Sequence, residues 1–301
     1  MYKISAIVCT YQHMDFLPKS LQALTEQSLH AQDYEIIIIN NNSVDGTEEY
    51  CLNFIDTHLD HHITYYKETN QGLSYARNTG IKLSWGHIVC FIDDDAISDR
   101  NLLKEYITFF GSHPLASAAA GRVYPIFETK RPQWMLSFFL DLTSSLDLGD
   151  KMKLFPNKKY PVGANIAIKR NYLNLNDLFD VNLGKKGDNT ETGEVKDFFG
   201  RIQQSGSLIY YLPTAIVQHY VSAQQLTDTF LKQSATALGH SERLRTKNLS
   251  PKVYRRRIIT EIFLFTGSLF LCLWYTIRFQ PQIGLKLLKC HWYICRALLG
   301  F

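Results

Sequence analysis

The segment Ile88 to Asp95 (IVCFIDDD) places five apolar residues directly before three consecutive carboxylates. A run of β-branched and aromatic residues of this length is typical of a parallel strand that is buried on both faces. The three acids would then lie where the strand leaves the core, and adjacent carboxylates repel one another unless a cation is held there. Hard oxygen ligands favour Mg²⁺ or Mn²⁺ over Zn²⁺. The alternative interpretation is a solvated acidic turn, because carboxylates also favour the starts of helices.

Alternating strand and helix patterns fill the first half of the chain. The predicted strands are residues 4–9, 35–39, 63–66 and 88–92. Strands joined by helices form right-handed crossovers, which give a mostly parallel sheet covered on both faces. Ligands bind beyond the carboxyl ends of such strands. We therefore expect the loops after the first, second and fourth strands to meet in one crevice.

The second half of the chain shows a less regular pattern of apolar residues. We expect strands at residues 118–124, 160–168, 209–212 and 215–217, and helices after Glu194 and over residues 227–245. Residues 129–159 show no regular pattern. An excursion of this length predicts a lid or an acceptor wall, or else a segment that packs on the core.

Composition excludes several classes of protein. The chain has 301 residues, of which 46% are apolar, so it can bury a large core. Its net charge of +4 is not gathered into a basic face interleaved with aromatic residues, so no nucleic acid partner is expected. The six cysteines form no CxxC pair, which argues against a disulfide scaffold or a zinc site and fits a reducing cytoplasm. No apolar signal region follows Met1, so nothing marks export.

Four motifs occur in a characteristic order: CTYQ, INNNSVDGT, NQGLSYARNTG and FIDDD. Together they resemble the nucleotide-sugar-binding half of the inverting glycosyltransferases of family 2, which have the GT-A fold. The likeness is close over about residues 5–96 and continues loosely to about residue 240. It implies an α/β fold with a Rossmann-like, mostly parallel central sheet flanked by helices. The expected domains are a catalytic domain over residues 1–245, divided near residue 125 into donor and acceptor halves, and a helical tail over residues 246–301.

The resemblance also implies which residues bind the donor and a divalent cation. The expected donor-binding residues are Thr10, Tyr11, Asn40, Asn70, Arg77, Asp93 and Asp94. The expected metal ligands for Mg²⁺ or Mn²⁺ are Asp95 and His219. Asn40 stands where the family usually has Asp, so the base stays open, although a UDP-sugar is favoured. Arg77 would bind the diphosphate or brace the acidic loop, and His219 would otherwise be a satisfied surface residue.

The acceptor and the general base are expected in the second half. In GANIAI, the small residues Gly163 and Ala164 and the neighbouring Asn165 would lie beside the acceptor sugar, the alternative being a bulge in a strand. The family places an acid at the start of a helix to deprotonate the acceptor hydroxyl. Glu194 fits best, because only after it does an amphipathic helix follow, and Asp188 is the second choice. A purely helix-stabilising role for Glu194 is the alternative.

The tail has a different character. Three arginines, residues 255–257, precede the apolar stretch 258–277, whose only charge is Glu261. Twenty residues at about 1.5 Å each could just cross a bilayer core of about 30 Å. Residues 278–301 alternate basic and apolar side chains, as interfacial helices do. We expect attachment to a membrane surface at the cytoplasmic face of the plasma membrane, the alternative being a helical hairpin packed on the protein or on a partner.

The expected activity is transfer of a sugar from a nucleotide diphosphate sugar to a saccharide or lipid-linked hydroxyl acceptor. Two alternatives from other classes stay open. A non-catalytic sugar-nucleotide-binding protein is compatible with Asn40 and Val195 in place of the usual acids. A sugar nucleotidyltransferase is disfavoured, because CTYQHMDFL is not a glycine- and lysine-rich phosphate loop.

Overall fold

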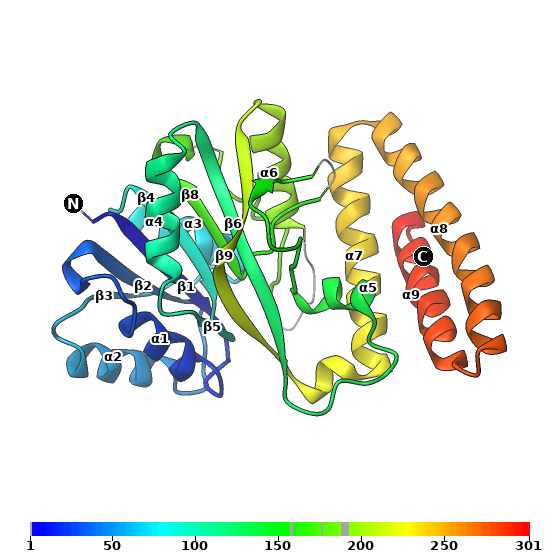
Figure 1. Ribbon diagram of the computed structural model, residues 1–301, viewed down its shortest axis with the longest axis horizontal. Helices are drawn as coiled ribbons and strands as arrows, with labels where there is room; N and C mark the ends of the chain where they lie inside the picture. Colours follow the sequence, from blue (N-terminus) through cyan, green and yellow to red (C-terminus); the bar gives the residue numbers. More distant parts are fainter. Residues whose placement is uncertain (1, 157–158, 176, 188–192) are drawn as a thin grey trace. The chain divides into compact units, whose positions relative to one another are not determined.

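The computed structural model describes residues 2–156, 159–175, 177–187 and 193–301 (Figure 1). These residues fall into two compact units. Unit 1 comprises the described parts of residues 1–126, 144–182 and 194–220, and unit 2 comprises those of 127–143, 183–193 and 221–301. Unit 1 holds the sheet and unit 2 holds a group of helices.

Half of the sheet in unit 1 is parallel, as the sequence predicts. Its four strands are β1 (Ile4–Thr10), β2 (Tyr34–Asn40), β3 (His62–Lys67) and β4 (Ile88–Asp93). They lie in the order β3-β2-β1-β4, and each pair is parallel. The intervening helices are α1 (Leu17–Thr25), α2 (Thr47–Thr57) and α3 (Leu73–Leu83), with a short 3₁₀ turn η1 (Ala31–Asp33). This arrangement brings the carboxyl ends of β1, β2 and β4 to one edge of the sheet.

The other half of the sheet joins β4 through antiparallel pairing with β8. Its strands are β5 (Ala96–Ser98), β6 (Ala116–Phe127), β7 (Lys153–Leu154), β8 (Asn165–Lys169) and β9 (Leu208–Val221). Strand β8 lies between β4 and β6 and is antiparallel to both, and β5 and β7 pair with β9. The α/β fold class is therefore confirmed, and the sheet is mixed.

Strand β9 corrects one expectation. The sequence suggested two strands separated at Pro213, but one strand runs through this proline. Pro213 lacks an N–H group, which normally excludes it from the middle of a sheet. Along the edge of β9 that faces β7 and β5, Pro213 lies between the stretch that pairs with β7 and the stretch that pairs with β5, so its missing donor interrupts neither of these two ladders; β6 lies along the other edge.

The sheet separates two apolar cores because successive side chains of a strand point to opposite faces. Ala6 and Val8 lie in one core and Ile7 in the other. The remaining helical elements of unit 1 are α4 (Leu102–Ser112), η3 (Arg170–Tyr172) and α6 (Glu194–Gln204). Helix α4 packs in the first core through Leu103 and Tyr106, and α6 packs in the second. The sheet is thus covered on both faces, as expected.

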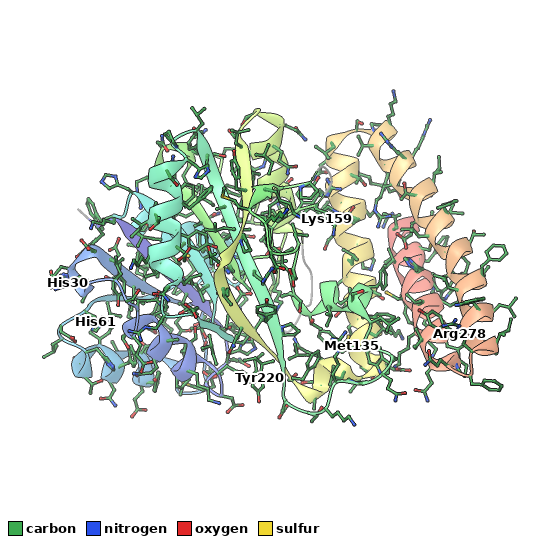
Figure 2. The ribbon with its side chains drawn as sticks, viewed as in Figure 1. His30, His61, Met135, Lys159, Tyr220 and Arg278 are labelled. Atoms are coloured by element: carbon green, nitrogen blue, oxygen red, sulfur yellow. The ribbon has the colours of Figure 1, made fainter. Side chains whose placement is uncertain are left out.

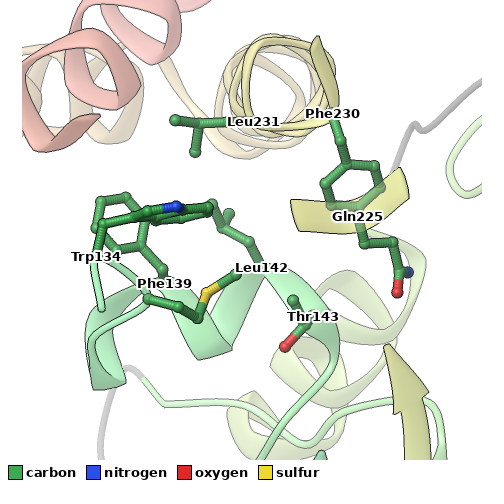
Figure 3. A pocket seen from close by; sticks show the side chains of 8 residues that line it. Trp134, Phe139, Leu142, Thr143, Gln225, Phe230 and Leu231 are labelled. Carbon is green, nitrogen blue, oxygen red and sulfur yellow. The ribbon is translucent and has the colours of Figure 1, made fainter. Parts of the chain in front are cut away.

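Unit 2 contains the first part of the segment that the sequence left irregular, residues 129–143. Its elements are α5 (Ser137–Leu140), η2 (Asp141–Thr143), η4 (Ala223–Leu226), α7 (Asp228–Leu249), α8 (Pro251–Ile277) and α9 (Pro281–Leu299). Trp134 and Phe139 share a buried apolar cluster with Leu231 of α7 and with Ile283 and Leu287 of α9. Figure 3 shows Trp134 and Phe139 facing Leu231 across a small apolar pocket. This segment was expected to form a lid or acceptor wall, or to pack on the core. Residues 134–143 pack in the apolar core of unit 2.

Helix α8 buries two polar residues, Glu261 and Ser268, and exposes many apolar ones. Glu261 is buried and pairs with Arg257 at 2.7 Å and with Nδ1 of His291 at 2.7 Å. Arg257 also pairs with buried Glu242 of α7 at 3.1 Å. Buried charges are tolerated only when they are paired in this way. The outward side chains of α8 include Phe263 and Phe270, which are 75% and 72% exposed.

Candidate active site

The loops after β1 and β2 are joined by hydrogen bonds. The backbone N–H of Asn41 donates to the carbonyl of Thr10 at 2.8 Å, and that of Gln12 donates to the hydroxyl of Ser43 at 3.0 Å. Asp45 accepts from the N–H of Met14 at 3.3 Å. Burial alone would raise the pKa of Asp45. The hydrogen bonds that its carboxylate accepts from Thr47 and Met14 nevertheless hold this pKa below the usual value. Two of the three predicted loops thus lie together.

Asn40 and Asn41 organise these loops from within. Asn40 is fully buried, accepting from the N–H of Ser43 at 2.8 Å and donating to the hydroxyl of Tyr65 at 3.0 Å. The side chain of Asn41 donates to the carbonyl of Asn70 at 2.8 Å and accepts from the N–H of Gly72 at 2.7 Å. Asn41 was missed in the sequence. The signal that could have indicated Asn41 is its position directly after a buried strand, in a loop expected to face the turn that contains Gly72.

The predicted donor residues differ in exposure. Thr10 is buried, and its hydroxyl has no hydrogen-bond partner among the described residues. Tyr11 is half-buried and accepts from the Gln12 amide at 3.1 Å. Asn70 is exposed and donates to Glu68 at 2.8 Å. Only Thr10 combines burial with an unsatisfied polar atom.

The three consecutive acids point in two directions. Asp95 lies 3.0 Å from Nε2 of His219, and Asp93 lies 3.9 Å from the same nitrogen. One ligand atom from each of these three residues lies within 4.8 Å of the others, so they could hold a metal ion. The β5–β9 pairing explains their meeting, because Ala96 is the register partner of His219. The structure therefore brings together the two predicted metal ligands, Asp95 and His219.

Asp94 faces the other way and meets a residue that the sequence did not single out. Its carboxylate lies 2.9 Å from Nδ1 of His13, in the loop after β1. His13, Asp94 and Asp95 form a second set whose ligand atoms lie within 4.8 Å of one another. His13 stood in a loop that the sequence placed in the crevice, but no motif distinguished it from its neighbours.

Arg77 of α3 is the buried cation of the site. Its guanidinium lies 2.6 Å from Glu194 and 3.5 Å from Asp93, and the rings of Phe91 and Phe179 lie within 6 Å of it. Burial alone would lower the pKa of Arg77, but Glu194 and Asp93 raise it above its usual value. Of the two roles considered for Arg77, bracing the acidic loop is therefore seen directly.

Glu194 begins α6 and is buried. One carboxylate oxygen accepts from Arg77, and the other, Oε2, has no hydrogen-bond partner among the described residues. A buried acceptor without a partner is costly, so such an atom often has a functional role. The second candidate base, Asp188, lies outside the described residues.

The segment expected at the acceptor lies beside Arg77. A β-carbon at Gly163 would collide with the Arg77 guanidinium, so glycine is required there for close approach. Ala164 and Asn165 are wholly buried behind it. The Asn165 amide donates to the carbonyl of Ala215 at 3.0 Å, and its oxygen accepts from Tyr106 at 2.6 Å. Asn165 thus ties β8 to its neighbours, while Gly163 lies next to the ion pair.

Comparisons with known proteins point to one family. Residues 5–175 match the family model described as "Glycosyl transferase family 2". The chain is 28% identical over 250 residues to a glucosyl-dolichyl phosphate glucuronosyltransferase of Haloferax volcanii, covering 80% of this chain and 77% of that protein. It is 24% identical over 290 residues to a poly(ribitol-phosphate) beta-glucosyltransferase of Bacillus spizizenii, covering 88% of this chain and 44% of that protein.

Solved structures confirm the fold. A mannosyltransferase from Pyrobaculum calidifontis, solved with GDP-Man and Mn²⁺, matches with a TM-score of 0.65 at 18% identity, covering 98% of this chain and 87% of that one. GalNAc-T7, solved with UDP, GalNAc and Mn²⁺, matches with a TM-score of 0.59 at 15% identity, covering 80% of this chain and 48% of that one. At these identities the likeness establishes the GT-A fold, which is the fold expected from the motifs.

Gly163→Ala tests the close approach at Arg77. The added methyl group must displace the guanidinium from its buried position, and overpacking of this kind typically costs about 1–3 kcal/mol of unfolding free energy. Urea unfolding followed by circular dichroism measures the change. Gly200→Ala in α6 is the matched control, since its β-carbon meets only Tyr160 at 3.7 Å and alanine is the better helix former. Equal stability of the Gly163 variant and the unmodified protein would show that Arg77 moves freely.

Proposed function

Because this chain belongs to glycosyl transferase family 2, we propose that it transfers a sugar, with inversion, from a nucleotide diphosphate sugar to a hydroxyl acceptor. The observation that carries the proposal is the continuous polar path in unit 1 from His219 and Asp95 through Asp93 and Arg77 to Glu194. The proposed cation site and the proposed base thus lie on either side of one buried guanidinium. A non-catalytic protein that only binds sugar nucleotides would have no need for the unsatisfied oxygen of Glu194.

The donor is held by residues of the loops after β1 to β4. We assign the nucleotide to Thr10, Tyr11 and Asn70, with Asn40 supporting their loops from within, and the diphosphate to Arg77 and the acids 93–95. The fit of a divalent cation, Mg²⁺ or Mn²⁺, is supported by the donor set itself, since carboxylate oxygens and one imidazole suit either ion. When bound, such a cation offsets the charge of the leaving diphosphate. Asp95 and His219 are its proposed ligands, and a UDP-sugar is the favoured donor.

Glu194 is the proposed general base. Inversion in one displacement needs a carboxylate that takes the proton of the attacking hydroxyl, on the face opposite the leaving group. Oε2 of Glu194 can accept that proton, while Arg77 fixes the orientation of the carboxylate through the other oxygen. The acceptor would enter beside Gly163, with Ala164 and Asn165 supporting that wall from behind. Asp188 is the alternative base.

The acceptor is proposed to be a saccharide or a lipid-linked hydroxyl compound. The name of the Haloferax relative gives it a glucosyl-dolichyl phosphate acceptor, and that of the Bacillus relative gives it a poly(ribitol-phosphate) acceptor. Both names describe the transfer of a sugar to a polymer or a glycolipid precursor. We propose a role of this chain in polysaccharide or glycolipid biosynthesis, with residues 1–245 as the catalytic domain and residues 246–301 as the attachment segment.

A cytoplasmic membrane surface is the proposed location. Helix α8 is long and apolar enough to cross a membrane by length and composition. Its outward apolar side chains stand between exposed basic residues, Arg255 and Arg256 at one end and Arg278 at the other. Basic residues that flank an apolar helix favour anionic headgroups on the cytoplasmic side. Such an attachment would concentrate lipid-linked acceptors at the enzyme.

Asp95→Asn tests donor binding. We expect the full-length protein to bind a nucleoside diphosphate more tightly with Mn²⁺ than without it, and the variant to lose this dependence while its melting temperature is kept. The sugar is identified by testing a panel of UDP- and GDP-sugars, with binding measured by calorimetry and turnover measured as donor hydrolysis. Asp15→Asn, an exposed acid in the neighbouring loop, makes the same change of charge and should behave as the unmodified protein. Undiminished Mn²⁺-dependent binding by the Asp95 variant would contradict the assignment.

Glu194→Gln separates catalysis from bracing. The variant also loses the charge partner of Arg77, so some loss of stability is expected in either case. If Glu194 is the base, kcat should fall about 10²-fold or more, well beyond any change in the dissociation constant of the donor. If Glu194 only braces Arg77, donor binding should weaken and kcat should fall by no more than the same factor. Asp188→Asn is the companion variant, and a loss of turnover confined to that variant would transfer the role to Asp188.

The outer face of α8 is tested by substitution rather than truncation. Removing residues 248–301 would also remove Ile283 and Leu287, which pack against Trp134, and would expose apolar surface. We expect Phe263→Glu combined with Phe270→Glu to abolish flotation with anionic vesicles. Val44→Glu, at a residue of unit 1 that is 83% exposed, is the control. Binding of the unmodified protein should survive high salt because apolar insertion is not screened, and its release by salt would reduce the contact to charge alone.

A further inference from the structure

Helices α8 and α9 of unit 2 form an antiparallel pair along most of the length of α8. Near the start of α8, the hydroxyl of Tyr254 donates to the carbonyl of Leu298 at 2.8 Å. Near its end, a β-carbon at Gly284 would collide with the backbone of Cys272. The ion pair between α8 and His291 lies between these two contacts. Any environment that α8 enters is therefore shared by α9.

The exposed side of α9 mixes basic and apolar residues. After the first turn of α9, its exposed residues are spaced three and four apart, which places them on one face of the helix: Leu285, Lys289, Trp292, Arg296 and Leu299. This stripe borders the apolar face of α8, because the ring of Trp292 lies 5.8 Å from that of Phe265. Basic and apolar residues on one helix are typical of a membrane interface, where long basic side chains reach the headgroups.

The pairing register places charges beside the middle of α8. Because Trp292 meets Phe265 and the helices run in opposite directions, Lys289 lies about one turn further along α8, near Ser268. Lys289 pairs with Asp228 of α7 at 3.3 Å, and these side chains are 52% and 58% exposed. If α8 crossed a bilayer, these exposed charges would lie near the bilayer centre, where charged side chains are costly. The helical group therefore disfavours a crossing.

Basic residues stand at both ends of α8. Arg255 and Arg256 are exposed near its start, and Arg278 follows its last residue, with the guanidinium 4.9 Å from the ring centroid of Trp274 (Figure 2). A helix that lies flat brings both ends to one headgroup layer. A crossing helix would carry Arg278 to the opposite side, which the positive-inside bias disfavours.

The chain itself offers these arginines few anionic partners. After residue 227 the sequence has three acids, and each is paired with a basic side chain: Asp228, Glu242 and Glu261. The exposed bases at the ends of α8 and on α9 thus suit an anionic surface outside the chain. Phospholipid phosphates beside acyl chains match both the charge of these residues and the apolar face between them.

We propose that α8 lies in the plane of an anionic phospholipid surface, within one leaflet, and does not cross the bilayer. The inference rests on the membrane location proposed above and adds the mode of attachment. The outer face of α8 would sink about 5–10 Å, to the boundary between headgroups and acyl chains. Lys289 and Arg296 of α9 would extend to the phosphates. The exposed polar residues of α7, among them Lys232 and Gln233, would stay in water.

Cysteine labelling of the full-length protein tests this orientation. The three single variants Asn248→Cys, Thr266→Cys and Gln280→Cys replace exposed, uncharged residues before, within and after α8. Each is bound to the outside of vesicles of phosphatidylcholine and phosphatidylglycerol, collected by flotation and treated with a membrane-impermeant maleimide. We expect the variants at 248 and 280 to be labelled equally. The variant at 266 should be protected on vesicles and labelled in the free protein. The unmodified protein, whose cysteines are buried or half-buried, gives the background.

The other outcomes would each contradict a different statement. Labelling at 248 with protection at both 266 and 280 would show that α8 crosses the bilayer. Labelling at 266 on floated vesicles would show that the apolar face stays outside the leaflet, so that charge alone holds the protein. Absence of flotation would contradict the membrane location itself, and this orientation with it. The measurement uses no sugar donor, so its result is independent of whether the chain transfers a sugar.

Discussion

The buried ion pair between Arg77 and Glu194 is the interaction on which the rest of the site depends. A guanidinium without a partner would be very costly to bury, and Glu194 at 2.6 Å and Asp93 at 3.5 Å offset that cost. Through its contacts with Glu194 and Asp93, Arg77 of α3 connects the first turn of α6 to the carboxyl end of β4. Gly163 gives the guanidinium its space, and Phe91 and Phe179 form its apolar surroundings. The candidate base and the acidic loop are thus fixed relative to each other by one side chain.

The acidic loop depends on strand pairing as much as on its own sequence. His219 meets Asp95 because β5 pairs antiparallel with β9. In this pairing His219 lies opposite Ala96, the residue that follows Asp95. A shift of one position would turn His219 to the other face of the sheet. The backbone bond from Tyr220 to Asp95 holds the same register. A short strand of three residues therefore determines which histidine faces the acids.

The first half of the fold could be predicted from the sequence because its information is local. Buried parallel strands are continuous apolar runs, and the strands at 4–9, 35–39, 63–66 and 88–92 were found within one or two residues of their ends. The site was predictable only where a motif marks it. His13 and Asn41 were missed, since each acts through a partner from a distant loop, Asp94 for the one and Asn70 with Gly72 for the other. The single strand through Pro213 was missed for the same reason, because the gap between its partners β7 and β5 is not visible in the sequence.

Helix α8 shows why hydropathy alone could not describe the tail. Read as a sequence, Glu261 is an isolated charge in an apolar stretch, and its cost seemed small only if it lay near one end. In the structure Glu261 faces inward to Arg257 and His291, and Arg257 reaches Glu242 of α7. The charges of Glu261, Arg257 and Glu242 are paired inside unit 2, while the exposed side of the middle of α8 carries phenylalanines and leucines. A soluble helix distributes these groups the other way, with its apolar stripe toward the core. Polar groups inside and apolar groups outside are what a lipid environment favours, since hydrocarbon neither competes for the ion pairs nor penalises the exposed rings. The same ion pairs fix α8 to α7 and α9, so the apolar face is presented as part of a rigid helical group.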